Sequence, residues 1–260
     1  MKKIKNLFLK IFDRKNKFIS FLSIIFFTLY SWSYIRKISL KYSFLLLPRV
    51  IYGKYFYEMT NFSQIKLDKV KYFEQKYKFS YLDMFTGNLM SWNKIIPKNK
   101  NIDYLEIGCF EGRSTVFIGE YENINKFVIV DTFGGSDEHK NREYDFKLVY
   151  DNFSSNIKKL KKDIDVNICT SDMYFEKNTQ EFDIIYIDGS HHYENVKKDF
   201  VNSYNRLRNN GILICDDFFW NYYDDYNLNP MKAILECYDL YKNNLKILFI
   251  NQQIFFKKII

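Results

Sequence analysis

The stretch IDYLEIGCFEGRST, residues 102–115, has the pattern of a buried strand that ends in a glycine turn and leads into a helix. Gly108 and Gly112 allow the backbone to turn tightly and to approach a ligand closely. The N-terminus of the next helix points its free N–H groups at the same place. Because the spacing is not Gly-x-Gly-x-x-Gly, a dinucleotide pyrophosphate is not the expected ligand. A glycine turn of this kind also occurs for structural reasons alone.

Four further apolar runs follow this stretch, and segments long enough for helices separate them. The runs are KFVIVD (126–131), VNICTSD (166–172), FDIIYIDG (182–189) and GILICDDF (211–218). Strands that are apolar on both faces and alternate with helices are typical of a parallel sheet covered on both sides. We therefore predict an α/β fold with a Rossmann-like, doubly wound sheet of about seven strands.

The two ends of this domain have patterns of their own. Residues 64–78 and 79–96 carry apolar side chains at helical spacing, so we expect residues 59–98 to form a helical lid before a core at 99–260.

At the C-terminus, Pro230 suits the first turn of a helix over about residues 231–242. The last two apolar runs, 245–250 and 252–259, are joined by a connection that is too short for parallel strands. We therefore expect an antiparallel pair at the end of the chain.

Polar residues end the second and third strands of the predicted sheet. Asp131 is placed to accept hydrogen bonds from ribose hydroxyls, although an acid there also serves as a strand-end cap. Ser171 and Asp172 stand where such folds read the edge of an adenine, and an Asx-type turn is an equal alternative.

Three carboxylates end the fourth and fifth strands, namely Asp188, Asp216 and Asp217. The carboxyl ends of adjacent parallel strands surround the ligand crevice of an open sheet. Three carboxylates that converge there repel one another unless a cation balances them. Oxygen ligands alone suit Mg²⁺ or a similar hard ion, so the pattern predicts a metal site.

The chain has three histidines, and two of them, His191 and His192, are neighbours just beyond Asp188. An imidazole at position 191 reaches the same crevice and can remove a proton from a substrate hydroxyl near neutral pH. The alternative for either histidine is a cap on the next helix. Because neighbouring side chains on a turn diverge, we expect His192 to be outside the site.

Taken together, these residues resemble a class I S-adenosylmethionine (SAM)-dependent methyltransferase over roughly residues 79–260. The pattern IDGSHHYENVKKDF (187–200) followed by LRNNGILICDDF (207–218) is similar to one branch of that superfamily. This branch contains the metal-dependent sugar O-methyltransferases of the macrolide type and the cephalosporin-hydroxylase-like proteins. The resemblance implies Mg²⁺ as a metal cofactor and transfer of a methyl group to a hydroxyl of a sugar, glycan or other small polar acceptor.

The resemblance also implies residue roles. His191 would be the base, and Asp188, Asp216 and Asp217 would hold Mg²⁺. Some relatives have Glu at the position of Asp216. The side chain of Asp is shorter, which puts the role of Asp216 as a metal ligand in doubt. The residues implied at the cofactor are Glu106, Gly108, Gly112, Ser114, Asp131, Thr132, Asp172 and Asp188.

Two other functions remain open at this stage. One is a hydroxylase-like or otherwise non-methylating enzyme on the same scaffold. The other is a membrane-attached protein that binds the cofactor without catalysis. The oligomeric state is open too, a homo-oligomer included.

The net charge of +8 is located almost entirely at the N-terminus. Residues 1–41 hold ten of the 39 basic residues and one of the 31 acidic ones, which leaves 29 basic and 30 acidic residues elsewhere. A nearly neutral body lacks the basic face of a nucleic-acid-binding protein, so nucleic acid is not an expected partner.

The basic N-terminus surrounds 18 consecutive uncharged residues, FISFLSIIFFTLYSWSYI (18–35), which just reach the length of a membrane-spanning helix. A cleaved signal peptide, a spanning anchor, a helix at the membrane interface or in a re-entrant pair with residues 43–53, and a buried helix of a soluble protein are the alternatives. Because SAM is a cytosolic cofactor, we favour the interfacial or re-entrant helix. Residues 1–58, and within them 1–53, would then bind the cytoplasmic face of a membrane through lysines that face anionic lipid.

Overall fold

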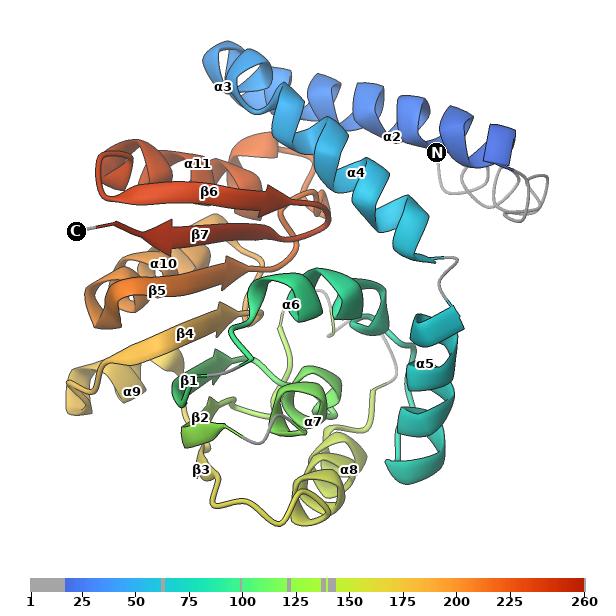
Figure 1. Cartoon of the computed structure of the whole chain (residues 1–260). Helices are drawn as coiled ribbons and strands as arrows, with labels where there is room; N and C mark the ends of the chain where they lie inside the picture. Colours follow the sequence, from blue (N-terminus) through green and yellow to red (C-terminus); the bar gives the residue numbers. More distant parts are fainter. Residues whose placement is uncertain are drawn as a thin grey trace.

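The computed structural model describes residues 17–61, 64–98, 100–120, 123–136, 139 and 144–259 (Figure 1). A seven-stranded sheet forms the centre, and helices cover both of its faces. The N-terminal helices α2 (Lys17–Ile38), α3 (Leu40–Leu45) and α4 (Leu47–Asn61) lie at the edge of the molecule where the chain also ends.

The sheet has the strand order β3-β2-β1-β4-β5-β7-β6. Strands β1 to β5 pair in parallel, and β7 pairs antiparallel with both β5 and β6. This confirms the predicted Rossmann-like sheet with an antiparallel C-terminal strand. The strands are β1 (Ile102–Ile107), β2 (Ile124–Val130), β3 (Asp165–Asn167), β4 (Phe182–Ile187), β5 (Leu207–Cys215), β6 (Leu245–Ile250) and β7 (Ile254–Lys258).

Alternate residues of the central strands enter two hydrophobic cores, one on each face of the sheet, because successive side chains of a strand point to opposite faces. On β4, for example, Ile185 and Ile187 join one core, and Ile184 and Tyr186 join the other. The first core is covered by α9 (Ser171–Lys177), α10 (Tyr193–Arg206) and α11 (Pro230–Tyr241), and the second by α5 (Gln64–Lys76), α6 (Leu89–Ile95), α7 (Arg113–Gly119) and α8 (Phe146–Lys158).

The chain reverses its direction of travel across the sheet between β1 and β4. It passes outward from β1 to β3 on one side and from β4 to β5 on the other, so β1 and β4 are neighbours with Ile107 beside Ile187. A ligand crevice forms at such a switch point, outside the carboxyl ends of the strands. The residues that follow Ile107 and Ile187 therefore lie at the expected site.

The segment predicted as a helix over residues 79–96 is helical only in its second half. A 3₁₀ turn at Thr86–Asn88 leads into α6, whereas residues 77–85 are irregular. The backbone N–H groups of Ser80 and Tyr81 donate to the carboxylate of Glu111 instead of to helical carbonyls. Bonds of this kind compete with helix formation, so apolar spacing alone was misleading here.

The third predicted strand, 166–172, is shorter than expected. Strand β3 ends at Asn167, and the side chain of Thr170 accepts a hydrogen bond from the N–H of Met173 as the N-cap of α9. Ser171 and Asp172 therefore lie in the first turn of a helix and not at the end of a strand.

The N-terminal helices pack on the edge of the domain. The rings of Tyr52 and Phe56 on α4 meet Phe249 of β6 edge-on, and the predicted boundary after residue 58 falls inside α4. Within the described part of the chain, no helix is both long enough and apolar enough to cross a membrane. Residues 1–16, which carry much of the predicted basic segment, lie outside the described residues.

Candidate active site

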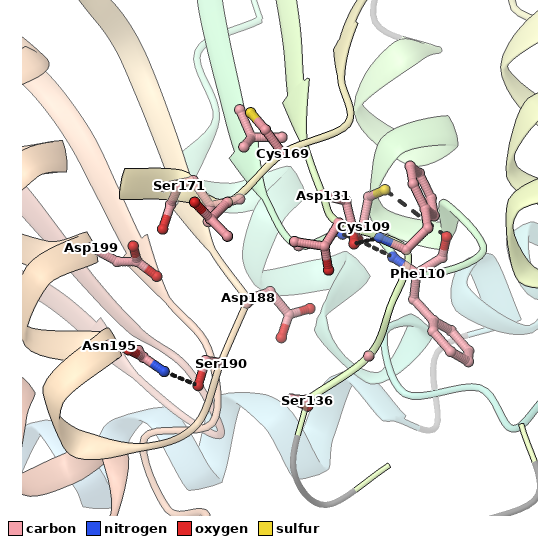
Figure 2. Close-up of a pocket in the computed structure, with 18 of the residues that line it drawn as sticks. Cys109, Phe110, Asp131, Ser136, Cys169, Ser171, Asp188, Ser190, Asn195 and Asp199 are labelled. Atoms are coloured by element: carbon pink, nitrogen blue, oxygen red, sulfur yellow. Dashed lines mark hydrogen bonds between the residues drawn. The ribbon is translucent and has the colours of Figure 1, made fainter. Parts of the chain in front are cut away.

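A cavity of about 370 Å³ lies at the carboxyl ends of β1, β2 and β4, where Figure 2 shows polar side chains from several elements around it. Its walls come from the glycine turn after β1, the loop after β2, the start of α9 and the face of α10. Of the predicted cofactor residues, those that line the cavity are Gly108, Asp131, Thr132, Asp172 and Asp188.

The glycine turn brings the ends of β1 and β4 into close contact. Gly108 has φ of 81°, a left-handed conformation, and a Cβ there would overlap the backbone oxygen of Asp188. Gly112 has φ of 82° and is the N-cap of α7; a Cβ there would lie 2.9 Å from the ring of Phe153. Both positions require glycine, but only Gly108 is at the cavity wall.

Glu106 stands behind the cavity wall. Its side chain is fully buried and accepts hydrogen bonds from the hydroxyls of Ser114 and Thr115. Burial raises the pKa of Glu106 to about 8. The structure thus places Glu106 and Ser114 as supports of the glycine turn; Thr115, which the sequence motif did not single out, completes the set.

Asp131 ties the ends of β1 and β2 together. Its Oδ2 accepts the N–H groups of Cys109 at 2.7 Å and Phe110 at 3.1 Å, and its Oδ1 accepts that of Phe133 at 2.7 Å (Figure 2). The strand-end cap is therefore present. Because each carboxylate oxygen can accept two hydrogen bonds, Oδ1 still has capacity for a ligand hydroxyl.

The far wall of the cavity comes from α10, which the sequence reading did not include. Asn195, Lys198 and Asp199 line it, and Lys198 lies 3.1 Å from the carboxylate of Asp172. Asp199 is almost fully buried, and burial raises its pKa to about 7. Asn195, Lys198 and Asp199 are spaced three to four residues apart, so they lie on one face of the helix. This spacing could have indicated a polar site, but polar residues at helical spacing usually mark a face exposed to solvent.

Asp188, His191 and Asp217 form a compact group beside the cavity. One ligand atom from each lies within 4.8 Å of the others. Nε2 of His191 is 2.6 Å from Oδ2 of Asp217 and 4.0 Å from Oδ1 of Asp188. Burial, and then the charge of Asp217, raise the pKa of Asp188. The ring of Trp220 packs against His191 with 5.4 Å between centroids.

Asp216 is not a member of this group, although it was predicted as a ligand with its neighbour. Its Oδ1 accepts the N–H of Asp217 at 2.7 Å, while its Oδ2 accepts from Nε2 of Gln253 at 2.7 Å and contacts the Tyr186 hydroxyl. Asp217 has φ of 53°, so the backbone turns sharply between the two side chains. Burial and the nearby Asp188 raise the pKa of Asp216 well above its usual range.

A buried hydrogen-bond chain therefore ends at Asp188. Nε1 of Trp92 donates to Gln253 at 2.8 Å, Gln253 donates to Asp216, and the Tyr186 hydroxyl joins Asp216 to Oδ2 of Asp188 at 2.8 Å. A tyrosine hydroxyl has one proton, so between two carboxylates it donates to one and accepts from the other in its protonated form.

His192 has the capping role that the sequence offered as an alternative. It is the N-cap of α10, and its Nδ1 accepts the N–H of Glu194 at 3.4 Å. The two histidines therefore serve different parts of the structure.

Comparison with known proteins agrees with this arrangement. Residues 105–218, which include the glycine turn and the ends of β4 and β5, match the model of a family described as a methyltransferase domain. No curated protein matches the sequence. This part of the chain is therefore similar to a methyltransferase domain.

Three solved structures share the fold at a TM-score of 0.50 each. The O-methyltransferase from Bacillus cereus in complex with SAH is 15% identical and covers 76% of this chain and 92% of its own. The O-methyltransferase TomG from Streptomyces achromogenes in complex with SAM is 9% identical, with 77% and 93% covered. The MycE methyltransferase of the mycinamycin biosynthetic pathway, in complex with Mg and SAH, is 14% identical, with 76% and 55% covered.

Proposed function

We propose that the methyltransferase domain transfers the methyl group of SAM to a hydroxyl of a sugar, glycan or other small polar acceptor. The observation that carries this proposal is the position of Asp188, which belongs both to the cavity wall and to the Asp188–His191–Asp217 group. A methyl donor in the cavity and an acceptor hydroxyl at the Asp188–His191–Asp217 group would therefore both lie beside the side chain of Asp188.

The cavity fits a nucleoside-sized cofactor. Its volume lies in the range of small-molecule sites. Oδ1 of Asp131 can accept a further hydrogen bond from a ribose hydroxyl. Ser171 and Asp172 line the part of the cavity that is expected to hold the adenine. SAM supplies an already activated methyl group, so the protein's task is mainly to position the two reactants.

The Asp188–His191–Asp217 group fits a divalent cation such as Mg²⁺. Its two carboxylates lie close together with side chains about one third exposed, an arrangement in which a cation relieves their repulsion. Asp188 and Asp217 would hold the ion, which when bound lowers the pKa of a coordinated hydroxyl. The structure of MycE with Mg is consistent with this choice.

His191 is the proposed base. The imidazole of His191 would take the proton from the acceptor hydroxyl, and the carboxylate of Asp217, 2.6 Å from its Nε2, would stabilise the resulting imidazolium. Trp220 packs on the ring and keeps it in place. We also place the domain on the cytosolic side, with residues 1–53 at the membrane surface, because SAM is a cytosolic cofactor.

The test uses the purified full chain with SAM and an extract of the producing cells as the source of acceptor. We expect S-adenosylhomocysteine to form, and formation to fall sharply with a chelator and recover with Mg²⁺. Binding of SAM without this product would favour the non-catalytic alternative, and consumption of the acceptor without it would favour a non-methylating enzyme. Full activity with the chelator would contradict the metal assignment alone.

We expect Tyr186→Phe to lower the affinity for Mg²⁺ by about 10-fold, because partners that orient metal ligands typically contribute 10–100-fold. The variant removes the hydroxyl that links Asp188 to Asp216 and leaves the rest of the ring in the core. Titration calorimetry measures the affinity. Tyr174→Phe, a buried tyrosine of α9 in the opposite core, is the matched control and should leave the affinity unchanged. Equal Mg²⁺ affinities in the two variants would mean that the hydrogen bonds of the Tyr186 hydroxyl do not orient Asp188.

A further inference from the structure

Over residues 21–30, every exposed residue of α2 is apolar or aromatic. The exposed residues recur at helical spacing along one side, and Phe21 and Leu29 expose 57% and 59% of their surface. We call this set the α2 stripe: Phe21, Leu22, Ile25, Phe26, Leu29 and Tyr30. The opposite side, which packs on the protein, includes Ile24, Thr28, Ser31, Tyr34 and Ile35. A surface helix of a soluble protein exposes mainly polar and charged residues, which the α2 stripe does not.

The stripe continues onto α3. The ring of Trp32 meets that of Phe44 edge-on at 6.1 Å, and Phe44 exposes 61% of its surface. Leu40 and Leu45 of the same short helix are also exposed. The α2 stripe together with these α3 residues forms what we call the α2–α3 face. A continuous exposed apolar surface of this kind marks an interaction site.

The charges around this face favour an anionic lipid surface as its occupant. Residues 14–57 contain no Asp or Glu, and Arg36 and Lys37 follow the stripe at the C-terminal end of α2, whereas Lys41 of α3 pairs with Asp239 at 3.3 Å. The guanidinium of Arg36 lies over the ring of Trp32 at 5.4 Å. Apolar side chains beside basic ones match a bilayer with anionic headgroups, whereas a second copy would bring like charges together.

Helix α2 also contacts the loop that follows Asp217. The hydroxyl of Tyr34 donates to the carbonyl of Trp220 at 3.1 Å, and the side chain of Asn221 donates to the hydroxyl of Tyr30 at 3.4 Å. Trp220 in turn packs on His191. Only one residue therefore separates α2 from the proposed base, and α2 runs along the outer edge of the molecule (Figure 1).

We propose that the α2–α3 face lies in the surface of an anionic bilayer, and that the acceptor is the headgroup hydroxyl of a membrane-anchored molecule. The second clause rests on the proposed methyl transfer, whereas the first does not. A bilayer on this face would lie beside the loop 216–225, so a headgroup could reach His191 without its apolar anchor leaving the membrane.

Vesicle binding tests the first clause with the full chain. We expect co-sedimentation with vesicles of phosphatidylcholine and phosphatidylglycerol, weaker binding to phosphatidylcholine alone, and loss of binding as salt screens the charges. The double variant Ile25→Gln/Leu29→Gln should bind at least about 10-fold more weakly, since each exposed side chain loses its insertion into the bilayer. Leu67→Gln, an exposed leucine of α5, is the matched control and should bind as the wild type does.

Two outcomes would overturn the membrane assignment. One is vesicle binding that is equal in the double variant and in the Leu67→Gln control. The other is a wild-type protein that does not bind vesicles but forms a dimer in sedimentation velocity, together with a double variant that is monomeric. The latter result would make the face an interface between copies. Circular dichroism of each variant checks that the fold is retained.

The acceptor is tested with methyl-labelled SAM and separated fractions of the producing cells. We expect label in the organic-solvent extract of the membranes and little in the soluble fraction. Label confined to the soluble fraction would overturn the membrane-anchored acceptor and leave the methyl transfer standing. Absence of both label and S-adenosylhomocysteine would instead contradict the proposed function, while the vesicle result would stand by itself.

Discussion

His191→Ala is expected to lower the rate of methyl transfer by about 10²–10⁴-fold, the usual contribution of a positioned acid or base. The imidazole of His191 is the base proposed beside Asp188 and Asp217, and alanine leaves the acceptor hydroxyl without a group to take its proton. Binding of SAM should stay nearly unchanged, because His191 is not among the residues that line the cavity. The rate is measured as S-adenosylhomocysteine formed at saturating SAM, and the binding by calorimetry.

The neighbouring histidine provides the control for this prediction. His192→Ala removes the cap of α10 and should lower the free energy of unfolding by about 1 kcal/mol, as loss of a helix cap does. Its effect on the rate should be small, since its ring packs against Tyr223 and not against the group at Asp217. Similar losses of rate in the two variants would contradict the assignment of the base.

Asp217→Asn separates the two roles proposed for the group. Asp217 would hold the metal and also stabilise the protonated ring of His191, so its replacement should lower both the Mg²⁺ affinity and the rate. In His191→Ala the rate should fall with little change in Mg²⁺ affinity. If His191→Ala abolishes Mg²⁺ binding, His191 is a ligand and not the base.

The sheet was predictable because each strand is a local apolar run. The strands at the centre of the sheet are buried on both faces. The turn after β1 was predictable from Gly108 and Gly112, which no other residue can replace without steric overlap. The helix predicted over residues 79–96 failed because of a partner distant in sequence. The backbone at Ser80 and Tyr81 is not helical because the carboxylate of Glu111, 31 and 30 residues later in the chain, accepts their N–H groups.

The different roles of Asp216 and Asp217 have the same origin. The sequence places two equivalent acids at the end of β5, and nothing in their neighbours distinguishes them. Gln253, just before β7, and Tyr186 on β4 hold one of them, and the left-handed backbone at Asp217 turns the other toward His191. A pattern of residue types could locate the carboxylates but could not say which of them faces the group.

Gly108→Ala is expected to abolish measurable SAM binding and to lower the free energy of unfolding by more than about 2 kcal/mol. A non-glycine residue in the left-handed region costs roughly 1–2 kcal/mol, and overpacking adds about 1–3 kcal/mol. The Cβ would overlap the backbone oxygen of Asp188, which belongs to β4 and not to a flexible side chain, so one of the two strand ends must move. Calorimetry with SAM and thermal unfolding measure the two effects.

Gly134→Ala is the matched control, because its Cβ would lie 3.6 Å from Oγ1 of Thr132, an ordinary contact, in the loop after β2. It should bind SAM and unfold as the wild type does. The separation of Gly108 and Asp188 sets both the cavity wall and the position of the Asp188 carboxylate beside His191. Loss of SAM binding in Gly108→Ala should therefore be accompanied by a loss of Mg²⁺ affinity, although Gly108 contributes no ligand atom. Retention of Mg²⁺ affinity would mean that the two halves of the site are positioned independently.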